Sequence, residues 1–348
     1  MSLKFRYNHA LYTMHYLLLM CLFVACSSGR RYFPDNLQPA EVSIVRFDSA
    51  LLSIDTQTEP AAVAVCRLYE EYPDFMRVFA EDILGIEAAD TAFMIEALPN
   101  YLNDTVYGFA ATNSRVRAVF ADITDICRAL GMAFARLQYI YPDYTVPEIT
   151  FFVSGFNASL FFWGDMSQKV AVGVDMYLGA DWEYYNRVVW NYQKQTMRKE
   201  CIPADVVSAC LFRLIPFSSS KSRLLENMVY RGKVMYLLSL LLPEEPQHEI
   251  MGYTKEQWQW AVKNERNVWN MIVDKRDLWK TESPVLTSYL NDGPFTTEIS
   301  QEAPPRLGTF IGWRIAESYM TRNTGVRLQD LMSEGDAQKI LEESAYRP

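Results

Sequence analysis

The sequence predicts an α+β protein that is mainly α-helical, with one globular domain and a small central strand pair or sheet. Apolar residues recur at helical intervals before residue 140 and after residue 183. Between these regions, two short segments are rich in β-branched and aromatic residues, as strands are. The length of 348 residues fits one large domain with a modest N-terminal part, and an aromatic content of 14% excludes general disorder.

The chain begins with the features of a bacterial lipoprotein signal. Lys4 and Arg6 precede a short apolar run that starts at Tyr16, and the run is too short to span a bilayer. Small residues stand directly ahead of Cys26. We predict a signal peptide over residues 1–25 and lipidation of Cys26; the alternative is an ordinary secretory signal or a single membrane anchor.

Removal of residues 1–25 takes away two basic residues and no acidic one, which changes the formal charge from -9 to -11. An acidic body argues against nucleic acid or an anionic lipid surface as the main partner. Residues 26–40 are a tether that turns basic at Arg30 and Arg31, with no acidic run after Cys26. We expect a lipid-anchored protein at the periplasmic face of the outer membrane.

The globular domain is predicted over residues 41–348, and its N-terminal part, 41–145, is mostly helical. A strand over Val42–Asp48 is followed by a helical segment through Leu52 that Asp48 and Ser49 can cap. Residues 61–84 predict two helices that meet at Pro73, because proline stops a helix that reaches it. Residues 90–140 continue as helix.

The second part of the domain, 146–348, begins with the predicted strand pair, Glu148–Val153 and Lys169–Val174, joined by a turn-rich segment. Helices follow over 183–199, 204–215, 221–242, 255–280 and 306–322, with two short helices at the C-terminus. Pro203, Pro216, Pro243 and Pro284 fall between these segments. Gly308 and Gly312 would let the 306–322 helix pack closely on a neighbour.

Four cysteines besides Cys26 remain after the signal, at Cys66, Cys127, Cys201 and Cys210. A bridge between Cys201 and Cys210 is one interpretation in an oxidising compartment. The other is that the four are isolated thiols that pack as small apolar residues, since no CxxC or secreted-scaffold spacing is present.

Histidine is scarce, and this restricts the chemistry. His9 and His15 lie in the signal, so His248, in an acidic loop, is the one histidine of the mature chain. A two-histidine zinc site of the HExxH kind needs both imidazoles on one helix face and cannot be built. A serine or cysteine triad would have to use His248 as its base. We therefore expect no metal, no cofactor and no catalytic residue.

Paired carboxylates offer the remaining catalytic interpretation. Asp175 follows the second strand, Asp181 and Glu183 stand near a helix start, and Glu265 lies within a helix. Such pairs can serve a glycosidase or bind a cation. Acidic residues at helix starts are also expected from capping and the helix dipole alone.

Several short blocks occur in an order that resembles the gliding-motility lipoprotein GldB family. They are Ile44–Asp48, Glu71–Phe75, Val153–Phe156, Val172–Gly179, Met228–Lys233, Gly252–Thr254, Asn264–Trp269, Gly293–Phe295, Arg306–Gly312 and Ser344–Pro348. The resemblance covers nearly the whole mature chain. It implies an envelope lipoprotein connected with surface gliding and with the secretion of motility adhesins.

The family layout is also distantly similar to a group of predicted zinc peptidases, which implies a degenerate zincin-like architecture. That group carries HExxH on a helix and an acid before a glycine on a later helix. Here Ala204-Asp205-Val206-Val207-Ser208 contains no HExxH, and Arg231 stands before Gly232. The resemblance thus implies a peptidase-like fold that is used for binding.

We expect a non-enzymatic protein that binds an envelope protein or a cell-wall glycan in a cleft. The residues expected to line it are Asp175, Tyr177, Gly179, Arg231, Lys233, Glu265 and Trp269. The alternative is that these blocks are packing and capping devices. A carboxylate-dependent glycan hydrolase that uses Asp175 and Glu265 is the second functional hypothesis.

Overall fold

The computed structural model describes residues 32–348. The chain divides into two units, Met1–Leu37 and Gln38–Pro348, and every helix and strand named below belongs to the second. The predicted signal peptide and the lipidation of Cys26 lie outside the described residues. No helix within residues 32–348 is long and apolar enough to cross a membrane.

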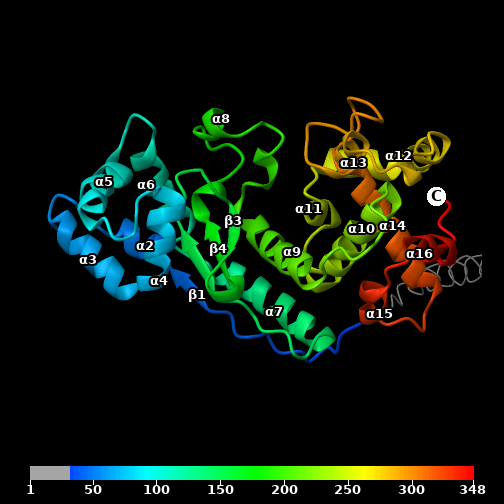
Figure 1. Ribbon diagram of the computed structural model, residues 1–348, viewed down its shortest axis with the longest axis horizontal. Coiled ribbons are helices and arrows are strands. Elements are labelled where there is room, and N and C mark those ends of the chain that lie inside the picture. The colour runs from blue at the N-terminus through cyan, green and yellow to red at the C-terminus, as the bar shows by residue number, and fades with distance from the viewer. Residues whose placement is uncertain (1–31) are drawn as a thin grey trace, which may run out of the picture. The chain divides into compact units, whose positions relative to one another are not determined.

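The N-terminal half of the second unit is a set of helices beside one short strand, β1 (Ile44–Arg46) (Figure 1). The helices are α2 (Phe47–Leu52), α3 (Ala61–Glu71), α4 (Pro73–Val78), the π-helix η1 (Phe79–Leu84), α5 (Thr91–Asn103), α6 (Phe109–Val119) and α7 (Thr124–Ile140). The predicted break at Pro73 is confirmed, because α3 ends at Glu71 and Pro73 begins α4. The predicted cap is wrong: Asp48 lies inside α2, buried, and accepts two 2.8 Å hydrogen bonds from Arg46.

The sheet has four strands in the order β1-β2-β4-β3. The predicted strands appear as β2 (Ile149–Phe152) and β4 (Lys169–Gly173), which pair in parallel. The segment between them, predicted as a turn, contains a further strand, β3 (Leu160–Trp163), antiparallel to β4. β3 was not predicted, because its four apolar residues stand between turn formers. In the fold these residues form an edge strand of the sheet.

The C-terminal half is helical, with α10 and α14 at its centre (Figure 1). Its α-helices are α8 (Tyr185–Val188), α9 (Ile202–Leu214), α10 (Leu224–Leu241), α11 (Gln247–Met251), α12 (Lys255–Asp274), α13 (Ser283–Leu290), α14 (Leu307–Arg322), α15 (Leu328–Ser333) and α16 (Ala337–Ser344). Short 3-10 helices cover Asp165–Ser167, Val174–Met176, Lys194–Thr196, Lys199–Cys201 and Asp277–Trp279. The prediction of a mainly helical α+β fold with a small central sheet is confirmed.

Two local predictions in this half are wrong. Residues 183–199 form α8 and 3-10 turns, because the segment is an excursion closed by an antiparallel bridge between Leu178 and Arg198. Pro203 and Pro284 do not separate helices but stand in the first turns of α9 and α13, where a missing amide costs nothing. The helix α13 was missed for that reason.

The close packing predicted for the glycines of α14 is confirmed. A β-carbon on Gly312 would lie 1.8 Å from the carbonyl oxygen of Met228, and one on Gly232 would lie 1.9 Å from the backbone of Gly312. The backbones of α10 and α14 are therefore in direct contact, and only glycine fits at this crossing. This contact fixes the position of every side chain that the two helices present.

An aromatic cluster joins the N-terminal helices to the sheet. The ring of Phe75 on α4 lies 5.0 Å from Phe47, 5.6 Å from Phe152 on β2 and 5.0 Å from Trp163 on β3, mostly edge to face. Trp163 packs on Phe75 at one end of β3. The other end of the strand can therefore face a cavity. The thiols of Cys66, Cys127, Cys201 and Cys210 are free, and Cys66 is exposed rather than packed inside.

Candidate functional site

A cavity of about 850 Å³ lies where α9, α10 and the start of α14 face the beginning of β3. In Figure 1, α9 lies between β3 and α11, and residues near all three line the cavity. We call it the cleft. The residues that give it its chemical character are Ser159, Leu160, Tyr177, Asp205, Ser208, Arg231, Glu249, Asp292, Arg306 and Thr309.

The cleft includes residues of the α9 stretch in which the sequence contains no HExxH. Ala204 and Ser208 lie one turn apart on α9, and both line the cleft together with Arg231 of α10. Alanine has no donor atom, and a guanidinium is positively charged, so this set does not fit zinc. Within residues 32–348, no three histidine, cysteine, aspartate or glutamate side chains are grouped to hold a metal ion.

Asp205 is the acidic group on the α9 side of the cleft. Its Oδ2 accepts a 2.8 Å hydrogen bond from the hydroxyl of Tyr177. Burial raises the pKa of Asp205 to about 6, while the Tyr177 hydrogen bond and Arg306 oppose the shift. Near pH 6, therefore, the carboxyl group exchanges between neutral and charged forms.

Arg306 is held in the cleft by an unusual backbone. Its φ of 58° places a non-glycine residue in the left-handed region, immediately before α14. Its Nε lies 2.9 Å from Oδ1 of Asp292, and its Nη2 donates to the carbonyl of Met251. A β-carbon on Gly252, which has a φ of 68°, would lie 2.6 Å from that Nη2. Glycine at position 252 thus makes room for the guanidinium.

Arg231 contacts the cleft from α10. Its Nη1 donates a 2.6 Å hydrogen bond to the carbonyl of Leu290 at the end of α13. Burial lowers the pKa of Arg231, and the nearby Arg306 lowers it further. Within the described residues Arg231 forms no ion pair shorter than 4 Å, and the nearby Asp292 carboxylate opposes the lowering of its pKa.

Two of the predicted cleft residues, Asp175 and Gly179, stabilise the backbone next to the cleft. The carboxylate of Asp175 accepts hydrogen bonds from the amides of Ser154 and Phe156, both 2.7 Å, and from the Ser154 hydroxyl. Burial raises the pKa of Asp175 and these bonds oppose the shift. Gly179 has a φ of 112° and donates its amide to Met197. Asp175 joins two loops at the end of the sheet, and Gly179 turns the chain after Tyr177.

The other three predicted residues lie in a different region, around the C-terminal helices. Lys233 donates to the carbonyls of Met332 and Glu334, and burial lowers its pKa to about 8. Glu265 on α12 accepts a 2.8 Å hydrogen bond from the hydroxyl of Tyr346. The ring of Trp269 packs edge-on at 5.3 Å against Tyr346. Of the predicted set, only Tyr177 and Arg231 line the cleft.

Most of the cleft residues were not singled out from the sequence as site residues, among them Asp292, Arg306 and Thr309. A signal existed for Arg306, because it follows Pro304 and Pro305 at the start of a predicted helix. Nothing in the sequence indicated Asp292, which depends on the path of the loop after α13.

A second cavity, of about 910 Å³, lies beyond the other end of β3, and Phe162, Trp163 and Arg213 contribute to its wall. Lys169 there forms a 2.9 Å ion pair with Glu148 and stands 4.8 Å above the ring of Trp163. Arg213 stacks on Phe162 at 4.9 Å. Lys169 and Arg213 therefore already have partners within the protein.

Comparison with known proteins identifies one family. A model of the family described as gliding motility protein GldB matches residues 34–348. No curated protein and no solved structure matches the chain.

Proposed function

Since the chain belongs to the gliding motility protein GldB family, we propose that it is a non-catalytic envelope lipoprotein whose cleft binds a partner of the gliding or adhesin-secretion machinery. Acylated Cys26 holds it to the outer membrane on the periplasmic side. The partner is an envelope protein or, as the alternative, a cell-wall glycan.

The observation that carries this proposal is the composition of the cleft. Ala204 and Ser208, from the α9 stretch without HExxH, line the pocket together with Arg231, and the pocket has the size of a ligand site. A cavity lined by charged and polar groups without a metal donor set is suited to binding rather than hydrolysis by zinc.

The carboxylate-dependent hydrolase has less support. Asp175 is buried in a loop-to-loop hydrogen-bond network, and Glu265 is bonded to Arg314 and Tyr346 on the C-terminal helices. A glycosidase needs its two carboxyl groups to flank one bond, at most about 10 Å apart, in a shared site. Neither residue lines the cleft.

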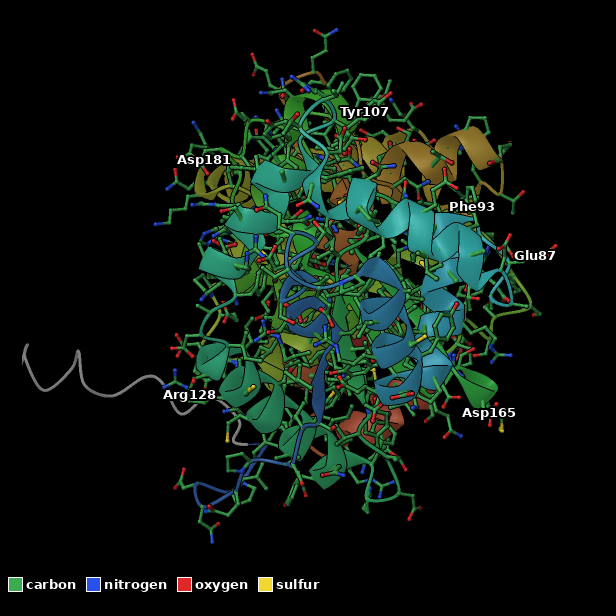
Figure 2. All side chains as sticks on the ribbon, turned by 90° about the vertical axis from the view of Figure 1, so that its left-hand side faces the viewer. Glu87, Phe93, Tyr107, Arg128, Asp165 and Asp181 are labelled. Carbon is green, nitrogen blue, oxygen red and sulfur yellow. The ribbon has the colours of Figure 1, made fainter. Side chains whose placement is uncertain are left out.

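Site-directed photocrosslinking in living cells tests the proposal. The photoreactive amino acid p-benzoylphenylalanine replaces Phe212, which lines the cleft and is 37% exposed, or Phe93, which is 52% exposed on α5 and points outward in Figure 2. We expect a discrete adduct with an envelope component from position 212 and none from position 93. The same adducts from both positions, or none from either, would contradict binding in the cleft.

The anchor is tested separately. The Cys26→Ser variant of the full chain should leave the membrane fraction and appear in the soluble periplasmic fraction, because the acyl chains supply the membrane affinity. Retention of the variant in the membrane fraction would contradict lipidation at Cys26.

A further inference from the structure

We propose that the cleft binds an extended peptide segment that pairs with the free edge of β3 and places a carboxylate between Arg231 and the first turn of α14. The inference rests on the proposed binding function and names the chemistry of the partner. The carboxylate is either a chain terminus or an aspartate or glutamate side chain.

The first observation is at the start of α14. Arg306, directly before α14, and Thr309 of its first turn line the cleft. The first amides of a helix have no carbonyl partner within the helix and carry partial positive charge, which favours an anion. The first of them, that of Leu307, donates to the hydroxyl of Thr296 at 3.4 Å. Thr309 is only 4% exposed, and its hydroxyl has no hydrogen-bond partner within the described residues. A buried hydroxyl without a partner is costly unless a ligand completes it.

The second observation is the distribution of charge in the cleft. Three carboxylates line it, and each has a partner: Asp205 has the Tyr177 hydroxyl, Asp292 has Arg306, and Glu249 has Arg198. Within residues 32–348 the hydrogen-bond acceptor of Arg231 is the carbonyl of Leu290, and the Asp292 carboxylate, already paired with Arg306, acts on Arg231 from beyond ion-pair distance. A guanidinium with free N–H groups binds a carboxylate in preference to neutral groups, because charge-assisted pairs are the stronger ones.

The third observation is the free edge of β3. The amide of Gly173 donates to the carbonyl of Ser159, which fixes the alternation of the antiparallel ladder. By that alternation, the amides and carbonyls of Leu160 and Phe162 point away from β4. Within residues 32–348, β3 is the last strand of the sheet and no backbone group pairs with these four.

These observations meet at the start of β3, where the strand borders the cleft. Ser159 and Leu160 at the start of β3 line the same cleft as Arg231 and Thr309, and Phe162 lines the cavity at the other end of the strand. A peptide that adds to an exposed edge gains main-chain hydrogen bonds, and a terminal or side-chain carboxylate then fixes its register. A glycan would leave the edge of β3 unpaired, so the free edge favours a peptide.

The test measures binding of labelled octapeptides to the full lipidated protein in detergent micelles by fluorescence anisotropy. The peptides come in three sets that share one sequence library, which has no acidic residue of its own. Set one ends in a free carboxylate. Set two has one added glutamate and a C-terminal amide, and set three has glutamine in place of that glutamate and the same amide. We expect set one or set two to contain binders at least ten-fold tighter than any in set three. Which set contains them identifies the source of the carboxylate.

Protein variants and modified peptides separate the two parts of the site. Arg231→Gln should lower the affinity of the best binder at least ten-fold and Thr309→Val about three-fold. Arg128→Gln, the same change on an exposed residue of α7 (Figure 2), should leave it unchanged. Two further peptides are N-methylated at every second amide, one at the odd and one at the even positions. One of the two should bind at least ten-fold more weakly, because its methyl groups replace the amide hydrogens that pair with β3.

Several results would overturn the inference: no binder in set one or two, equal binding in set three, equal loss in Arg231→Gln and Arg128→Gln, or no effect of N-methylation in either register. Binding of a uronate oligosaccharide in the absence of any peptide binder would also overturn it. If position 212 gives an envelope adduct and no peptide binds, the peptide inference fails while the proposed function stands.

Discussion

The two ends of the α10–α14 helix pair present buried charges in different ways. Around α12 and α16, Glu265 receives hydrogen bonds from both Arg314 and Tyr346, so its charge is completed within the protein. In the cleft, Arg231 has a carbonyl and Thr309 has no partner among the described residues. Unsatisfied buried groups destabilise a fold. Of the eight buried side-chain atoms without a hydrogen-bond partner in the described residues, those of Arg306 and Thr309 lie in the cleft. The comparison separates residues that hold the fold from residues available for binding.

Both regions depend on the contact between α10 and α14. A substitution that disrupts this contact should therefore have the largest effect on stability. Gly312→Ala places a β-carbon 1.8 Å from the backbone of Met228, which forces the helices apart. We expect the free energy of unfolding to fall by more than about 3 kcal/mol, measured by urea titration. The control is Gly335→Ala, where a β-carbon meets nothing within 4 Å. Equal stability of the two variants would contradict the packing.

An intermediate effect is expected around α12 and α16, where the carboxylate of Glu265 has its hydrogen-bond partners within the protein. Tyr346→Phe removes the hydroxyl that donates to Glu265, and Tyr346 is only 8% exposed. We expect a loss of about 2 kcal/mol in the free energy of unfolding, because a buried carboxylate loses one of two partners.

The control for this variant is Tyr107→Phe, since Tyr107 is 72% exposed and points outward in Figure 2. That change should leave stability within about 0.5 kcal/mol of the wild type. Photocrosslinking from position 212 should be unaffected by Tyr346→Phe. A loss of crosslinking at unchanged stability would mean that the two regions are not separate.

The sequence predicted the fold better than the site. Helix periodicity, the proline at Pro73 and the glycines of α14 are local signals, and each corresponded to a feature of the structure. β3 was missed, since an apolar edge strand four residues long looks like part of a loop when its neighbours are turn formers. Pro284 hid α13 because proline both ends helices and begins them.

Where the predicted site residues lie in the fold depends on tertiary contacts. Arg231 and Lys233 are two residues apart on α10, so they point to different sides of that helix. Arg231 lines the cleft, and Lys233 bonds to carbonyls at the end of α15. Sequence blocks indicate that a stretch matters, but the side each residue faces decides what it does. The pairing of Glu265 with Tyr346 joins residues too distant in sequence for any local pattern to indicate.

The smallest expected effect concerns Asp205, the carboxylate of the cleft whose charged form the fold disfavours. Burial raises its pKa from 3.8 to about 6, so the neutral form is favoured in the folded protein. This contribution to stability is complete below pH 4 and is lost as the pH rises through 6. Asp205→Asn removes the titration. We expect the stability of the variant relative to the wild type to rise by about 1–2 kcal/mol between pH 4.5 and pH 7.5, measured by urea titration.

Tyr177→Phe sharpens this test, because it keeps the carboxylate and removes the hydrogen bond that lowers its pKa. The pH at which stability falls should then shift upward relative to the wild type. A difference between Asp205→Asn and wild type that does not change from pH 4.5 to 7.5 would show that Asp205 keeps an ordinary pKa. In that case the carboxylate would be solvated like one on the surface, and the cleft would be open to water rather than partly desolvated.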